Sequence, residues 1–200
     1  SQLADFPAAV AELSTVFTAK AAPSAKLAAI KGATVPTAAW KRVFIKALQD
    51  SSYEVVQASL EKLCKTYPEE SERFLQETKE VYGMSNSVSI KWHELAALYT
   101  AGKKVSQDRL VDYASAKWEF RTRGNAFSAL KNLGYCDEQL IAHIFDALLS
   151  TNSRLVAPAA QLAEFLAQQT AYKNMMAAYY KSRTWAAWEK TQLKSSLAFL

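Results

Sequence analysis

Residues 36–66 read PTAAWKRVFIKALQDSSYEVVQASLEKLCKT, and this stretch decides the fold class. Its first half repeats apolar side chains at intervals of three and four residues, which predicts an amphipathic helix with one buried face. That face would carry Trp40, Val43, Phe44, Ala47 and Leu48. The polar run Asp50-Ser51-Ser52 then interrupts the pattern. The first half of the stretch is therefore one helix that ends before residue 50.

The second half of the stretch repeats the scheme. Ser51 stands three residues before Glu54, a spacing that predicts a capping box at the start of the next helix. Apolar side chains then recur at helical spacing at Tyr53, Val56, Leu60 and Leu63. Two helices with so short a break between them are expected to run antiparallel, because a short loop cannot carry the chain to the far end of its partner.

The rest of the chain follows the same pattern. Pro23 and Ser24 are expected to open a helix that ends near Gly32, Ser106 and Asp137 to cap two others, and Gly134 to end a helix in the left-handed conformation. Further helices are expected around residues 5–17, 68–83, 90–99, 106–114, 118–133, 137–148, 155–169, 171–181 and 184–200, with a loop over 84–89. With 35 alanines and only five glycines and five prolines, the composition also favours helices over strands.

Two fragments fit the pattern of a HEAT repeat, in which an aspartate ends one helix and V-R-x-x-A-x-x-A-L forms the next. The first has Asp50 and Val55, and the second has Arg123, Ala126 and Ala129-Leu130. Their offset is not a multiple of the ~40 to 47 residues expected for such repeats. We therefore predict an all-α fold of antiparallel helix pairs stacked as a HEAT-like α-solenoid. Residues 1–200 would form one domain, with 1–35 as a looser helical pair and 36–200 as HEAT-like pairs.

The net charge of +5 is distributed unevenly along the chain. Residues 50–80 carry eight acidic and four basic side chains, whereas residues 170–200 carry five basic and one acidic. A nucleic-acid-binding protein usually concentrates its lysines and arginines in one stripe. This distribution favours a solvated basic surface, so no nucleic acid is expected as a partner.

Motifs for catalysis are missing from the sequence. His93-Glu94 begins like the zinc motif H-E-x-x-H, but Ala97 stands where the second histidine is required, and His143 is followed four residues later by Ala147. The chain has no phosphate-binding loop and no nucleophile elbow, and Cys64 and Cys136 are too far apart in sequence to suggest a metal knuckle. We expect no catalytic residue, no metal ligand and no cofactor in this chain, and no membrane span.

Two groups of side chains are candidates for a surface that faces a partner or substrate. They are the arginines Arg121, Arg123 and Arg154, and the C-terminal aromatic and basic stretch from Tyr179 to Trp185 with Trp188, Lys190 and Lys194, from which Lys181, Arg183 and Trp185 are selected. Each group has an alternative interpretation. The arginines can pair within the chain with an aspartate of a neighbouring repeat, and the aromatic side chains near Trp185 can form the core of the last helix pair.

Three segments carry a resemblance to a known family: Ala47 to Val55, Phe120-Arg121-Thr122-Arg123 with Ala126 and Ala129-Leu130, and Asn152-Ser153-Arg154-Leu155. From Trp40 to its end, the chain resembles the C-terminal helical region of zinc aminopeptidases related to aminopeptidase N, of the gluzincin family and in particular its long bacterial members. The H-E-x-x-H-x18-E zinc site and the G-x-M-E-N motif of that family are absent here.

The resemblance implies that the chain is a fragment of a longer protein. It would be a non-catalytic helical domain whose partner is the peptidase domain of the same protein, with zinc bound only in that separate domain. It would restrict the access of peptide substrates, and an exported or periplasmic location would follow from the family. The alternative is a free-standing α-solenoid that binds a protein partner along its concave face.

Overall fold

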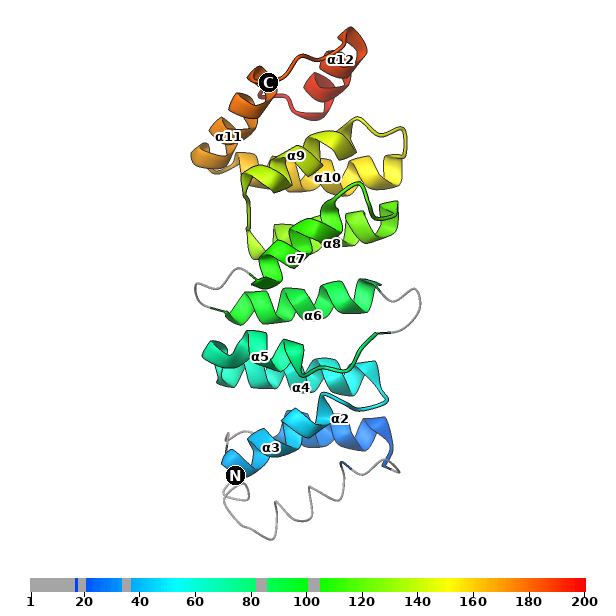
Figure 1. The fold of residues 1–200 in the computed structure, drawn as a ribbon, viewed down its shortest axis with the longest axis vertical. Helices are drawn as coiled ribbons and strands as arrows, with labels where there is room; N and C mark the ends of the chain where they lie inside the picture. The colour runs from blue at the N-terminus through cyan, green and yellow to red at the C-terminus, as the bar shows by residue number, and fades with distance from the viewer. Residues whose placement is uncertain (1–16, 18–20, 34–36, 82–85, 101–104) are drawn as a thin grey trace. The chain divides into compact units, whose positions relative to one another are not determined.

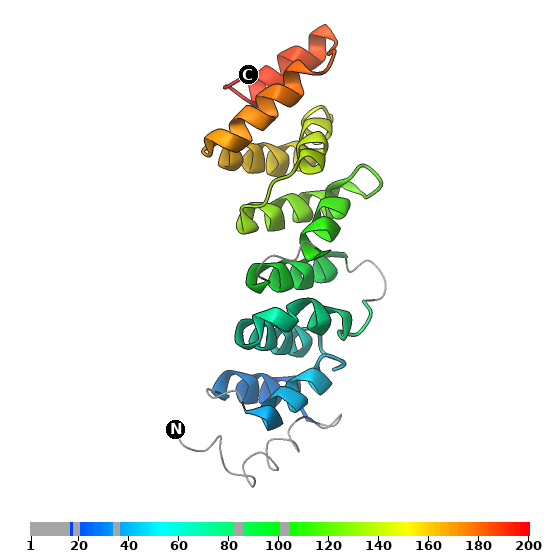
Figure 2. The ribbon, with the colours of Figure 1, turned by 60° about the vertical axis from the view of Figure 1, so that its left-hand side comes forward.

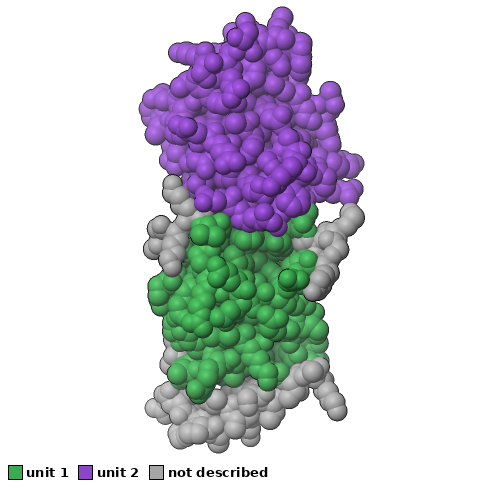
Figure 3. All heavy atoms as spheres, viewed as in Figure 1, with its two compact units in different colours: residues 1–106 green, residues 107–200 purple. Residues whose placement is uncertain are grey.

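The computed structural model describes residue 17 and residues 21–33, 37–81, 86–100 and 105–200. Within these ranges the ordered elements are all helical, so the all-α fold is confirmed for the described part of the chain (Figure 1). The expected helix over residues 5–17 lies outside the described residues except for Phe17. The chain divides into two compact units, residues 1–106 and 107–200 (Figure 3).

Unit 1 is organised around one central helix. Its helices are α2 (Pro23–Gly32), α3 (Ala38–Ala47), α4 (Tyr53–Thr66), the short 3-10 helix η2 (Pro68–Glu70), α5 (Ser71–Gln76) and α6 (Asn86–Tyr99). Helix α4 packs against α2, α3, α5 and α6. The apolar face predicted for residues 40–48 lies in this core, where Trp40, Phe44 and Leu48 are buried against Leu60 and Phe74.

Unit 2 contains most of α7 (Val105–Ala114), then α8 (Phe120–Leu133), α9 (Glu138–Leu148), α10 (Ser153–Ala167), α11 (Thr170–Lys181) and α12 (Ala187–Ser196). Helix α10 packs against α8, α9 and α11, while both α11 and α12 pack against α9 (Figure 2). Phe127, Leu130, Ile144 and Phe145 are fully buried in this unit. The arrangement within each unit is compatible with stacked helix pairs, and the HEAT-like solenoid stays a prediction.

Several predicted helix boundaries are confirmed. Helix α2 begins at Pro23 and ends at Gly32. Gly134 ends α8 with a φ of 62°, in the left-handed region that glycine adopts without steric strain. The Asp137 carboxylate caps α9 by accepting a hydrogen bond from the Leu140 N–H at 2.7 Å.

Two predicted caps are wrong. Helix α4 begins after Ser52, and no side chain caps its N-terminus. Just before the helix, the Asp50 carboxylate accepts a hydrogen bond from the Ser52 N–H at 2.9 Å. Ser106 lies inside α7, and its N–H donates instead to the Glu72 carboxylate of α5 at 3.1 Å. In both places a charged carboxylate accepts a hydrogen bond from an N–H group at the start of the helix.

Two predicted elements also have different limits. Helix α5 ends at Gln76, although the helix was expected to continue to residue 83. Past this point the Lys79 N–H donates to the carbonyl oxygen of Leu48 at 3.0 Å, so the backbone is bonded to the end of α3. In the loop expected over residues 84–89, residues 86–89 are the first turn of α6.

Candidate partner-binding surface

The aromatic side chains near the C-terminus pack against one another and against α9. The ring centroids of Tyr179 and Trp185 lie 5.0 and 5.8 Å from that of Phe145. Tyr180 stacks on Trp185 with 6.0 Å between centroids, and the Trp185 indole N–H donates to the Tyr180 carbonyl oxygen at 2.7 Å. Trp185, a candidate for contact with a partner, is half-buried and makes these contacts within unit 2. This agrees with the alternative interpretation, in which the aromatic side chains near Trp185 form the core of the last helix pair.

Lys181 and Arg183, in contrast, are exposed on the surface of unit 2. The Arg183 guanidinium lies 5.0 Å from the centroid of the Tyr179 ring, a distance at which a cation is attracted to the ring face. Arg183 and Trp185 therefore contact the same aromatic cluster. The Arg183 side chain is exposed to solvent, and the Trp185 indole packs against the other rings.

Trp188 belongs to the same aromatic and basic stretch, and 58% of it is exposed, so it does not form part of the core that the alternative interpretation expected. It stands five residues before Leu193, the buried residue of α12, and five residues at 100° each place two side chains about 140° apart around a helix. This spacing was a usable signal in the sequence. The two tryptophans of this stretch therefore differ in burial: Trp185 is half-buried, and Trp188 is exposed.

The three candidate arginines lie in different environments. Arg123 on α8 is buried, with its side chain 8% exposed, and its guanidinium donates to the Ala114 carbonyl oxygen at 3.0 Å and to the Asp146 carboxylate at 2.7 Å. Arg121 and Arg154 are exposed. Arg123 therefore forms an intramolecular pair with an aspartate of the following helix rather than part of an open binding surface.

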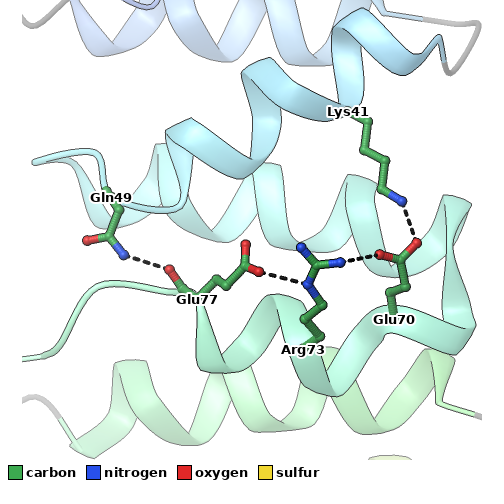
Figure 4. A network of polar contacts seen from close by, with 5 residues as sticks. All are labelled: Lys41, Gln49, Glu70, Arg73 and Glu77. Carbon is green, nitrogen blue, oxygen red and sulfur yellow. Dashed lines mark hydrogen bonds and ion pairs between the residues drawn. The ribbon is translucent and has the colours of Figure 1, made fainter.

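The acidic residues around η2 form a structural network in unit 1 (Figure 4). Glu70 is paired with Lys41 of α3 and with Arg73, and Arg73 also contacts Glu77 at 2.8 Å. The Gln49 side-chain amide donates to the Glu77 carbonyl oxygen at 2.6 Å. These contacts hold α5 against the end of α3.

A small open pocket lies beside this network, and the sequence patterns did not indicate it. Its lining includes the rings of Trp40, Phe44 and Tyr67 together with Lys41 and Lys62. The Lys41 ammonium lies 4.1 Å from the centroid of the Tyr67 ring and is also paired with Glu70. The positive charge of Lys41, which lies nearest the aromatic rings of the pocket, is therefore already neutralised by Glu70 of the same chain.

The environments of the two thiols and of His143 favour their neutral forms. Burial raises the pKa of Cys64 to about 11, and burial with the nearby Asp137 carboxylate raises the pKa of Cys136 to about 12. A thiol with so high a pKa is a poor nucleophile at neutral pH. Burial and the Arg123 guanidinium lower the pKa of His143, which keeps this imidazole neutral at pH 7.

No group of three or more histidine, cysteine, aspartate or glutamate side chains that could hold a metal ion occurs among the described residues. None of the helices within the described ranges is both long enough and apolar enough to cross a lipid bilayer.

Comparisons of the chain with protein-family models, with curated proteins and with solved structures found no match. The resemblance to aminopeptidase-like helical regions therefore rests on the three segments quoted from the sequence.

Proposed function

We propose that this chain is a non-catalytic helical domain of a zinc aminopeptidase-like protein, where it packs against the peptidase domain and restricts the access of substrates. The observation that supports this role is that polar side chains in the three resembling segments make hydrogen bonds and ion pairs within the chain. Asp50 pairs with the buried Lys26 at 2.6 Å, Arg123 bonds Ala114 and Asp146, and Asn152 caps α10. These groups stabilise the helical framework and are not left free for chemistry.

The proposal assigns zinc and the catalytic groups to a separate domain of the same protein. Peptides would reach that domain past a wall of packed helices, and the helical domain would act through its shape and surface charge. The alternative is a free-standing α-solenoid that binds a protein partner. The exposed Trp188 supports either version, because both need a protein-binding surface.

The first test is to read the gene upstream of this chain and to assay both the whole protein and the isolated chain. We expect an H-E-x-x-H motif upstream, hydrolysis of aminoacyl-p-nitroanilides by the whole protein, loss of activity with a chelator, and no activity in the isolated chain. Activity in the isolated chain, or a reading frame without that motif, contradicts the proposal.

A second test addresses access. Deleting residues 37–200 from the whole protein should increase the cleavage of long peptides relative to that of a single aminoacyl substrate. Cleavage of the small substrate shows in the same experiment that the peptidase domain has folded. An unchanged ratio in an active truncated protein would remove the gating role and leave only a packing role.

A further inference from the structure

Arg183 differs from the other arginines that lie over aromatic rings. Among the described residues, the guanidinium carbons of Arg109, Arg121 and Arg183 lie 4.7, 5.4 and 5.0 Å from ring centroids. Arg109 also pairs with the Asp112 carboxylate at 2.9 Å, and Arg121 interacts electrostatically with the Glu119 carboxylate. Arg183 has neither an ion pair nor a hydrogen bond from its guanidinium in the described part of the chain. It is therefore a stacked cation without a counter-ion.

The sequence around Arg183 explains why no carboxylate lies close to it along the chain. Residues 179–187 read YYKSRTWAA and contain no aspartate or glutamate. The one acidic side chain of residues 170–200 is Glu189, which accepts a hydrogen bond from the Ala186 N–H at 2.7 Å at the start of α12. A guanidinium carries five N–H donors, and those of Arg183 have no acceptor among the described residues.

The turn that carries Arg183 is bonded on both sides of this residue. The Ser182 hydroxyl donates to the Tyr179 carbonyl oxygen at 2.9 Å, and the Trp185 indole N–H donates to the Tyr180 carbonyl oxygen at 2.7 Å. The Tyr179 ring, over which the guanidinium lies, itself packs against α9. A cation on such a support loses less conformational freedom when it binds an anion, and this increases the affinity.

Arg109 shows within the same chain which group such a cation binds. Tyr113 stands four residues after Arg109, and Tyr179 stands four residues before Arg183, so each cation lies over a ring at the same spacing. A guanidinium can stack on a ring with its face and donate to a carboxylate with its edge. At Arg109 the carboxylate is that of Asp112. The Arg183 pair has the ring and lacks the carboxylate.

We propose that Arg183, stacked on Tyr179, binds a carboxylate on an acidic surface of a partner protein. Lys181 adds positive charge there, because it is exposed, has no ion pair in the described ranges, and lies two residues away, at most about 7 Å along the chain. We call these three residues the Arg183 site. This inference deepens the proposed function and rests on it, because it names the chemical group by which the peptidase domain would hold the helical domain.

Two other anionic partners match the Arg183 site less well. Nucleic-acid binding uses a stripe of several cations that follows the phosphate backbone. An anionic membrane attracts clusters of about four to eight lysines and arginines. The Arg183 site contains two cations, and two cations match one or two carboxylates on the surface of a protein.

The test measures binding of the chain to the peptide acetyl-Gly-Glu-Glu-Gly-amide by ¹H–¹⁵N NMR. The Nε–H resonance of Arg183, identified by its loss in Arg183→Lys, should shift as the peptide is added and shift less as salt is added. Backbone resonances of the site report binding to the variants. Arg183→Gln should bind at least about fivefold more weakly, because a charged donor is lost. Arg183→Lys should bind at least about threefold more weakly, because an ammonium lacks the planar fork.

Matched controls separate the Arg183 site from general charge. Arg42 is an exposed arginine of α3 with no ion pair and no ring contact in the described ranges, so Arg42→Gln removes the same charge elsewhere. This variant should bind the peptide as the unmodified chain does. The peptide acetyl-Gly-Gln-Gln-Gly-amide should leave the Arg183 resonance unchanged. Circular dichroism verifies that each variant is folded.

Equal losses in Arg183→Gln and Arg42→Gln would overturn the inference, as would an Arg183 resonance that the acidic peptide does not shift. Tighter, Arg183-dependent binding of inorganic phosphate than of the peptide would overturn it in favour of a phosphate site. The aminopeptidase assay is independent of these outcomes. A whole protein without a peptidase would refute the proposed function and leave the peptide result standing.

Discussion

At the scale of single residues, each unit contains a buried cation that reaches an aspartate more than twenty residues ahead in the chain. In unit 1, Lys26 pairs with Asp50, 24 positions later in the sequence, and in unit 2 Arg123 pairs with Asp146, 23 positions later. Lys26 belongs to α2 and Asp50 to the turn between α3 and α4, whereas Arg123 and Asp146 belong to the successive helices α8 and α9. These pairs join helices that the sequence patterns treat as separate elements.

Replacing Arg123 tests how much one such pair contributes to the free energy of unfolding. Arg123→Ala should lower the free energy of unfolding by about 2–4 kcal/mol, because the Ala114 carbonyl loses a buried donor and a packed side chain is removed. Arg121→Ala, two residues away and exposed, should change it by less than about 0.5 kcal/mol. Urea unfolding of both variants measures the difference, and equal effects would contradict the structural role assigned to Arg123.

The Lys26–Asp50 pair predicts a pH dependence. Burial by itself raises the pKa of Asp50, but the hydrogen bonds from Lys26 and from the Ser52 N–H outweigh it and hold the pKa below the ordinary value of 3.8. Since the pKa is lower in the folded state, the stabilisation is complete above the unfolded pKa and is lost as the pH falls below it. We expect Asp50→Asn to lower the free energy of unfolding by about 2–4 kcal/mol at pH 7 and by less at pH 3.

Urea unfolding of this variant and the unmodified chain at both pH values measures the effect. Glu164→Gln is the matched control, because Glu164 is an exposed carboxylate on α10 without an ion pair in the described residues. It should differ from the unmodified chain by less than about 0.5 kcal/mol at both pH values. A difference for Asp50→Asn that stays constant between pH 7 and pH 3 would show that the carboxylate charge is not what stabilises this turn.

At the scale of elements, close packing and backbone conformation determine where glycine is needed. Helices α8 and α10 approach closely at Gly124, where an added Cβ would lie 3.3 Å from Cγ of Pro158. Gly134 at the end of α8 has space for a side chain, with its nearest neighbour at 4.0 Å, but its φ of 62° is unfavourable for any residue with a Cβ. One position is thus limited by contact and the other by backbone conformation.

A pair of substitutions at glycines separates these causes. Gly134→Ala should lower the free energy of unfolding by about 1 kcal/mol through backbone strain alone. Gly32→Ala, at the end of α2 with no atom within 4 Å of the added Cβ, should be neutral or stabilise by up to about 1 kcal/mol. Thermal unfolding followed by circular dichroism measures both. The strain argument fails if Gly134→Ala is as stable as Gly32→Ala.

Element boundaries were predictable where a local group determines them and not where a distant one does. Pro23, Gly134 and Asp137 act on their own helix, so their effect was visible in the sequence. Helix α5 ends early because its following residues bond to the end of α3, and the Ser106 N–H in the first turn of α7 is bonded by Glu72. The hydrogen-bond partners in these two cases are 31 and 34 positions away in the sequence, so the spacing of apolar residues within one helix does not indicate them.

At the scale of the whole molecule, spacing alone was enough to predict an all-α chain, because apolar side chains at three and four residues have one geometry that buries them together. Periodicity also indicated which faces are internal, including Phe44, Leu60 and Leu130. Only the tertiary structure determined which polar and aromatic side chains are bonded or packed within the protein. Arg123 and Trp185 are engaged within unit 2, whereas Trp188 and the lysines of α12 are left outside. The physical reason is that exposure depends on which distant helix covers a side chain, and the identity of the residue does not determine this.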